Sequence, residues 1–131
     1  MPEARRDLVE RSLAFSTRLL RFVQLLRRST QVEPSVLYQL VRAGSAIGAH
    51  NAEAESAISR RQLLTLRAGA LREAREAQYW LTLLLDTTDR PPDAESAWLL
   101  QEVSELVAIL TTVVKRLGGT AAPKPDSSRT S

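Results

Sequence analysis

The chain has 131 residues, 44% of them hydrophobic and 25% charged, and a formal net charge of +3. These values are typical of one soluble domain with a single core, and they exclude both a disordered chain and two independent domains. The chain contains no cysteine and one histidine. This excludes a disulfide scaffold, a cysteine nucleophile and a multi-histidine metal or haem site, so we expect neither a metal nor another cofactor. The lack of cysteine suits a reducing compartment and predicts a cytoplasmic protein.

No targeting or membrane-spanning segment is expected. The N-terminal sequence MPEARRDLVERSL lacks the apolar core of a signal peptide. The longest stretch without Lys, Arg, Asp or Glu covers residues 43–52, shorter than the roughly 18 residues that a membrane span requires. A membrane is therefore not among the predicted partners.

The first predicted helix covers residues 7–28, where Asp7 and Glu10 resemble a capping box ahead of an apolar run. Its apolar residues form two neighbouring rows. One row is Leu8, Phe15, Leu19, Phe22 and Leu26, and the other is Val9, Leu13, Leu20 and Val23. Two rows make a face wider than one partner helix covers. We therefore expect residues such as Phe15 and Phe22 to contribute to helix packing and to contacts between subunits.

The second predicted helix covers residues 34–57 and begins with Pro34, a residue suited to the first helical position. Residues 43–49 are nearly all small, and they include Gly44 and Gly48. Each glycine inside a helix costs about 0.5–1 kcal/mol relative to alanine. Glycines four residues apart share a face on which another backbone can approach closely. That approach is either tight packing within the bundle or a contact between subunits.

The third predicted helix covers residues 59–85 and starts with a second capping box, Ser59 to Gln62. The fourth covers residues 93–117, after the breaker sequence DRPP, and Gly118–Gly119 is expected to end it. The following Pro- and Ser-rich segment predicts a disordered C-terminal tail. The chain is thus predicted to be all-α, an up-down-up-down antiparallel four-helix bundle over residues 1–118 with a flexible tail over 119–131.

In such an antiparallel bundle, the start of the first helix, the connection between the second and third helices, and the end of the fourth helix lie at one end. These three segments are rich in basic residues. The set comprises Arg5, Arg6, Arg11, Arg60, Arg61, Lys115 and Arg116. Sixteen of the 18 basic residues are arginine, which suits phosphate recognition, although a high-GC genome produces the same bias. In a single copy of the chain, a cluster of basic residues at one end is weak evidence for nucleic-acid binding. Copies aligned in a ring would add their charges and bind a polyanion through counterion release.

A polar constellation joins the second and third helices. Arg42 and Asn51 on one helix are predicted to bond Glu73 and Glu76 on the other, in an inter-helix network that fixes register. Tyr79 and Trp80 are interpreted mainly as packing residues, with base stacking as the alternative. The chain has no paired Glu-x-x-His motif, P-loop or G-x-G-x-x-G motif. We therefore predict no catalytic residues, no metal site and no enzymatic activity.

Three runs carry a resemblance to a known family. They are QLVRAGSAIGAHNAEA at residues 39–54, LREAREAQYWL at residues 71–81 and ERSLAF at residues 10–15. Together they resemble the bacterial four helix bundle protein family, which is related to proteins encoded in 23S ribosomal RNA intervening sequences. The resemblance implies a homopentameric barrel. It also implies kinship with the accessory variability protein of diversity-generating retroelements, which binds a reverse transcriptase and its RNA.

Two functional hypotheses follow. The first is a non-enzymatic homo-oligomer, with a pentamer favoured, that binds RNA or DNA through its clustered arginines. The alternative is a protein-interaction scaffold, such as a reverse-transcriptase accessory subunit.

Overall fold

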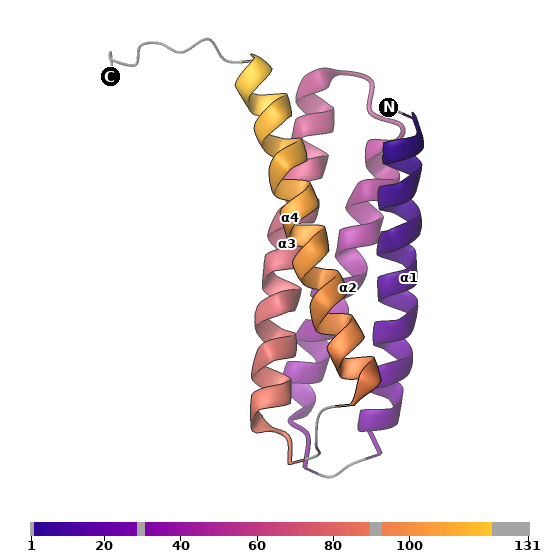
Figure 1. Ribbon diagram of the computed structural model, residues 1–131, viewed down its shortest axis with the longest axis vertical. Helices are drawn as coiled ribbons and strands as arrows, with labels where there is room; N and C mark the ends of the chain where they lie inside the picture. Colours follow the sequence, from indigo (N-terminus) through magenta and orange to yellow (C-terminus); the bar gives the residue numbers. More distant parts are fainter. Residues whose placement is uncertain (1, 29–30, 90–92, 122–131) are drawn as a thin grey trace, which may run out of the picture.

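Four helices account for nearly all of the described chain, and the all-α prediction is confirmed. The computed structural model describes residues 2–28, 31–89 and 93–121, and the side chains of 7–28, 31–89 and 93–118 among them. The helices are α1 (Pro2–Leu26), α2 (Pro34–Ala54), α3 (Arg60–Thr87) and α4 (Ala94–Ala121). None of these described residues forms a strand. Successive helices run in opposite directions, and in the view of Figure 1 they run down, up, down and up.

The helix starts follow local chemistry. Pro34 occupies the first turn of α2, where a missing N–H costs nothing. Ser59 caps α3 as predicted, since its Oγ accepts a hydrogen bond from the Gln62 N–H at 3.0 Å. At α4, the Ser96 N–H donates to Asp93 Oδ1 at 2.8 Å and the Asp93 N–H donates to Ser96 Oγ at 3.1 Å, which is a reciprocal capping box.

Three predicted helix ends are wrong. Because α1 starts at Pro2, Asp7 lies inside the helix; Pro2 suits a first turn, and the residues after it are good helix formers. Near the end of α2 the backbone N–H groups of residues 55–57 bond three residues back, so the α-helix ends at Ala54, before a tighter turn. Helix α4 continues through Gly118–Gly119 to Ala121. Glycine permits a helix stop but does not require one. Of the predicted tail, residues 122–131 lie outside the described residues.

The core is formed by the inward rows of all four helices. Fully buried side chains include Phe15 and Leu19 of α1, Leu40 and Ile47 of α2, Leu81 of α3, and the α4 row Leu99, Val103, Leu106 and Leu110. Phe22 is 3% exposed. Both phenylalanines therefore pack inside one bundle, and the part of the prediction that put them at a subunit contact is wrong.

Each helix packs against two neighbours, and among the described residues no Cα atoms of the diagonal pairs α1–α3 and α2–α4 lie within 8 Å of each other. The α1–α4 pair is the least extensive of the four. In Figure 1, α4 begins beside the end of α1 and diverges from it toward its own C-terminus. The bundle is thus tightest at α2–α3 and most open between its first and last helices.

Among the described residues, one helix is long and apolar enough to cross a membrane, residues Ala94–Gly118 of α4. The prediction that no segment qualifies is wrong, because it counted only uninterrupted uncharged runs and α4 tolerates Glu102 and Glu105 at high mean hydropathy. In this fold the apolar row of α4 faces the core, and Glu102 is paired with Arg11 of α1. The apolar row and the Glu102–Arg11 ion pair both lie at contacts between α4 and the other helices of the bundle.

Candidate functional site

The N-terminus of α1, the α2–α3 connection and the C-terminus of α4 lie at the same end of the bundle (Figure 1). The basic residues whose side chains are described and exposed there are Arg60, Arg61, Lys115 and Arg116. We call this set the basic end. Arg5 and Arg6 belong to α1 near the same end, but their side chains lie outside the described residues.

Arg11 is not part of the basic end, which corrects the sequence prediction. Its Nε and Nη2 donate to Glu102 Oε2 and Oε1, each at 2.9 Å, and Nη2 also donates to Glu105 Oε1 at 2.7 Å. The hydrogen bond to Glu102 raises the pKa of Arg11 above its ordinary value. The Arg11 guanidinium is paired with two carboxylates of α4, because the register of α1 against α4 places Glu102 and Glu105 opposite Arg11. It has no free donor fork for a phosphate.

A second ion pair closes the same α1–α4 seam. Arg18 donates from Nε and Nη2 to Glu95 Oε2 and Oε1 at 3.0 and 2.7 Å. Its guanidinium carbon lies 3.7 Å from the centre of the Trp98 ring, a cation–π contact. The hydrogen bond from Arg18 lowers the pKa of Glu95. The seam with the fewest backbone contacts is thus held by bidentate ion pairs that sequence analysis did not identify.

The α2–α3 polar cluster contains three of the four predicted residues. Arg42 pairs with Glu76 and lies 3.5 Å from Glu73 Oε1, measured from Nη1. Glu76 also accepts a hydrogen bond from Trp80 Nε1 at 3.0 Å. Glu73 Oε1 is buried and has no hydrogen bond, so the Arg42 charge is its closest compensation. The cluster ties the two helices together along their outer edge.

Asn51 belongs to a different network, which corrects its predicted pairing with the carboxylates of α3. Its Nδ2 donates to Ser12 Oγ at 2.9 Å, and its Oδ1 accepts from Arg67 Nη1 at 2.9 Å. Arg67 is 2% exposed and also donates to Glu55 Oε2 at 3.2 Å. Sequence analysis missed Arg67, although it stands three residues before Ala70, at the spacing of the inward row. The network joins α1, α2 and α3 inside the bundle.

The predicted aromatic pair separates into a packed and an exposed residue. Trp80 is half-buried and bonded to Glu76, whereas the Tyr79 side chain is 60% exposed. The two rings meet edge to face, with centroids 5.2 Å apart. Tyr79 is therefore not a core residue.

The two glycines of α2 face α1 inside one bundle. A Cβ at Gly44 would overlap Leu19 Cδ2, and a Cβ at Gly48 would lie 3.4 Å from Ser12 Cβ. The Ser16 hydroxyl donates to the Gly44 carbonyl at 3.0 Å across the same contact. Of the two readings of these glycines, the structure shows intramolecular packing.

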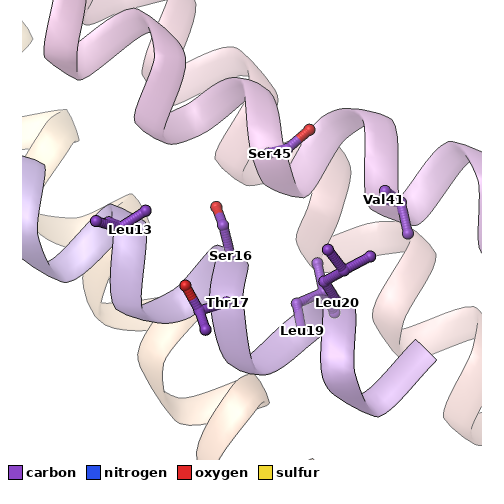
Figure 2. A pocket seen from close by; sticks show the side chains of 7 residues that line it. All are labelled: Leu13, Ser16, Thr17, Leu19, Leu20, Val41 and Ser45. Atoms are coloured by element: carbon purple, nitrogen blue, oxygen red, sulfur yellow. The ribbon is translucent and has the colours of Figure 1, made fainter. Parts of the chain in front are cut away.

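An apolar groove lies beside this contact, on the outside of α1 and α2. Figure 2 shows Leu13, Ser16, Thr17 and Leu20 of α1 across from Val41 and Ser45 of α2. The groove has a volume of about 220 Å³. Leu13 is 64% exposed and Leu20 is 43% exposed. These leucines come from the second predicted row of α1, of which only Val23 is fully buried.

Among the described side chains, no group of three or more His, Asp or Glu residues is placed to hold a metal ion. The features that the described residues present are the basic end, the apolar groove and the polar α1–α4 seam.

Comparisons with known proteins give one informative relative. No protein-family model matches the chain, and no curated protein does. A crystal structure from Bacteroides thetaiotaomicron, of a protein with unknown function from the S23 ribosomal protein family, is similar with a TM-score of 0.74 and 30% sequence identity. The alignment covers 82% of this chain and 98% of that one.

Proposed function

The chain belongs to the S23 ribosomal protein family, and from this membership and its surfaces we propose a non-enzymatic, self-associating helical bundle that binds nucleic acid, with RNA as the ligand. The name of the family supports RNA, because ribosomal proteins work on an RNA scaffold. The five-fold number of copies rests on the resemblance to the bacterial four helix bundle proteins. A cytoplasmic location is proposed from the absence of cysteine.

The observation that carries the self-association is the exposure of Leu13 and Leu20 around an apolar groove. Leu13 and Leu20 belong to one row of one helix and are exposed together beside Val41, so they form an apolar face that another helix can cover. Leu19, which also lines the groove, is buried in the core. A second copy of the chain covers the groove in our proposal.

The observation that supports RNA binding is the basic end. Four exposed cationic side chains lie at that end of each copy, beside exposed Asp7, Glu10, Glu53 and Glu55. Cyclic assembly around the bundle axis brings the cations of neighbouring copies and the mobile counterions around them to one face. Binding through phosphate contacts positions a nucleic acid without reading its sequence. Arg11 plays no part, because Glu102 and Glu105 hold it.

Two measurements test this function. Solution mass is measured for the wild type and for Leu13→Ser/Leu20→Ser; the wild type is expected to be oligomeric and the variant monomeric with an unchanged circular dichroism spectrum. RNA gel shifts are then compared for Arg60→Glu/Arg61→Glu and for Arg27→Glu/Arg28→Glu, which makes the same charge change at the opposite end. We expect the first pair of substitutions to abolish binding and the second to reduce it slightly. A monomeric wild type, or equal effects of the two pairs, contradicts the proposal.

A second candidate function is a scaffold for a protein partner, such as a reverse transcriptase. The outer part of α4 favours it, since Val107, Val113 and Val114 are only partly buried where α4 diverges from α1 (Figure 1). Co-purification of a reverse transcriptase with the wild type, lost on Val114→Asp, is the expected result for this function.

A further inference from the structure

The arginines at contacts between helices differ in environment from those on the outer face of α3. Arg11, Arg18, Arg42 and Arg67 lie at contacts between helices, and each is paired with a carboxylate. Arg72 and Arg75 lie on the outer face of α3 and are exposed. Within the described residues neither has a carboxylate within 4.0 Å.

Arg61, Arg72, Arg75 and Tyr79 share one face of α3. Separations of 11, 3 and 4 residues place them within a narrow arc of the helix, over about 27 Å of its axis. We call this set the α3 stripe. All four are exposed, and Arg61 joins the stripe to the basic end.

Among the described residues, no carboxylate forms an ion pair with Arg72 or Arg75. Glu73 and Glu76 follow these arginines in the sequence, but Glu73 lies beside Arg42, and Glu76 is bonded to Arg42 and Trp80. On the α4 side, Gln78 donates to Ser104 Oγ at 2.9 Å, and the exposed α4 residues that follow this face are Ala108 and Lys115. Two arginines three residues apart also repel each other slightly. Their juxtaposition therefore gives the bundle no stability and leaves a field that attracts anions.

The exposed ring of Tyr79 indicates which kind of anion the α3 stripe binds. Its ring is 60% exposed, yet the edge-to-face contact with Trp80 restrains it. A restrained, exposed aromatic ring one turn beyond an arginine is the arrangement on which an unpaired base stacks while its phosphates follow the cations. The bases of a duplex are stacked on each other and do not offer this face.

We propose that the α3 stripe binds a single-stranded nucleic acid, with Arg72 and Arg75 on its phosphates and the Tyr79 ring against a base. This inference rests on the nucleic-acid part of the proposed function, but it needs neither the oligomer nor the α1–α2 groove. In this proposal the nucleic acid lies along the side of the bundle. Arg61 belongs to both the α3 stripe and the basic end, so the same nucleic acid can contact both.

The test is fluorescence anisotropy with a labelled oligouridylate of about 15 nucleotides, within the usual site sizes for such binding, and with a duplex of the same length. Arg72→Gln/Arg75→Gln is expected to weaken single-strand binding by about tenfold. It should also lower the slope of log K against log salt by about 1.4, as expected for two lost phosphate contacts. Tyr79→Ala is expected to weaken binding by about tenfold or more, and Tyr79→Phe to retain it.

The matched control is Arg27→Gln/Arg28→Gln, which removes the same charge from exposed positions at the other end. If the control weakens binding as much as Arg72→Gln/Arg75→Gln, or if Tyr79→Ala has no effect, the inference is wrong. Preference for the duplex, or binding to phosphatidylserine vesicles in place of RNA, also overturns it.

A Lys115→Gln/Arg116→Gln variant separates the two proposals. If the wild type binds and only this variant loses affinity, RNA binding at the basic end stands and the stripe fails. If only the stripe variants lose affinity, the stripe stands and the basic end fails. A wild type that binds no nucleic acid contradicts both.

Discussion

Arg67 lies almost wholly inside the bundle and donates a hydrogen bond from Nη1 to Asn51 Oδ1 at 2.9 Å. Asn51 in turn donates to Ser12 Oγ, which donates to the Leu8 carbonyl at 2.7 Å. A buried guanidinium is costly unless its donors are satisfied. This chain of bonds, together with the Glu55 carboxylate, makes the burial of Arg67 tolerable and fixes how α1, α2 and α3 align.

Replacing the amide should therefore be far more harmful than its size suggests. Asn51→Leu removes the acceptor of the Arg67 Nη1 hydrogen bond and the donor to Ser12 Oγ inside the bundle, and we expect a loss of about 3 kcal/mol in the free energy of unfolding. Urea denaturation measures it. The double variant Asn51→Leu/Arg67→Met also removes the buried positive charge of residue 67, and it should recover at least half of the lost free energy of unfolding. A cost of Asn51→Leu below about 1 kcal/mol would contradict a structural role for the network.

The two glycines of α2 should respond differently to alanine. At Gly44 the added methyl overlaps buried Leu19, so Gly44→Ala should destabilise by about 1–2 kcal/mol despite the better helix propensity of alanine. At Gly48 the methyl meets Ser12 at an ordinary distance, and Gly48→Ala should be neutral or stabilising by up to about 1 kcal/mol. Thermal unfolding of the two variants gives the comparison. Equal effects of the two substitutions would show that α1 is not seated on Gly44 as described.

The glutamates of the α1–α4 seam make the free energy of unfolding depend on pH. Arg18 lowers the pKa of Glu95, and Gln101 together with Arg11 lowers that of Glu105, from an ordinary value of 4.5. Each glutamate then binds protons less readily in the folded than in the unfolded chain. Its contribution is fully present above about pH 5 and is lost as the pH falls through the lowered pKa values.

The measurement is urea denaturation between pH 3 and pH 6, with the midpoint expected to fall at the acid end. In Arg11→Met/Arg18→Met the carboxylates lose their cations, so the midpoint should fall less steeply over the same range. An identical pH profile for this variant and the wild type would mean that the ion pairs do not form in solution.

The cap of α3 offers a local test. The Ser59 hydroxyl satisfies the Gln62 N–H at 3.0 Å, so Ser59→Ala should cost about 1 kcal/mol of unfolding free energy. Ser59→Asp, which keeps an acceptor and adds a charge suited to a helix N-terminus, should restore it. If Ser59→Ala leaves the free energy of unfolding unchanged, water satisfies the Gln62 N–H equally well.

Much of the fold was predictable from local patterns. Apolar spacing identified four helices, Pro34 and Ser59 identified two of their starts, and short connections indicated antiparallel neighbours. Three boundaries failed. At Asp7 and at Gly118, a capping residue and a glycine each permit a helix end that the neighbouring residues can override, and α2 ends at Ala54, before a tighter turn.

The candidate site was less predictable. Sequence identified Arg42 with Glu73 and Glu76, because these residues face each other across adjacent helices. It placed Arg11 at a free basic surface, whereas the structure pairs it with Glu102. It read Tyr79 as packed, whereas the ring is exposed.

The sequence by itself determined that the chain forms four helices, in what order they follow, and at which end Arg60, Arg61, Lys115 and Arg116 gather, because these depend on spacing and on chain direction. Only the tertiary structure decided which charge meets which partner, which leucines stay in solvent and which arginines stay free. Those outcomes depend on the rotation and axial offset of each helix against its neighbours. The offset is set by contacts between residues distant in the chain, such as Leu19 against Gly44, and no local pattern encodes it.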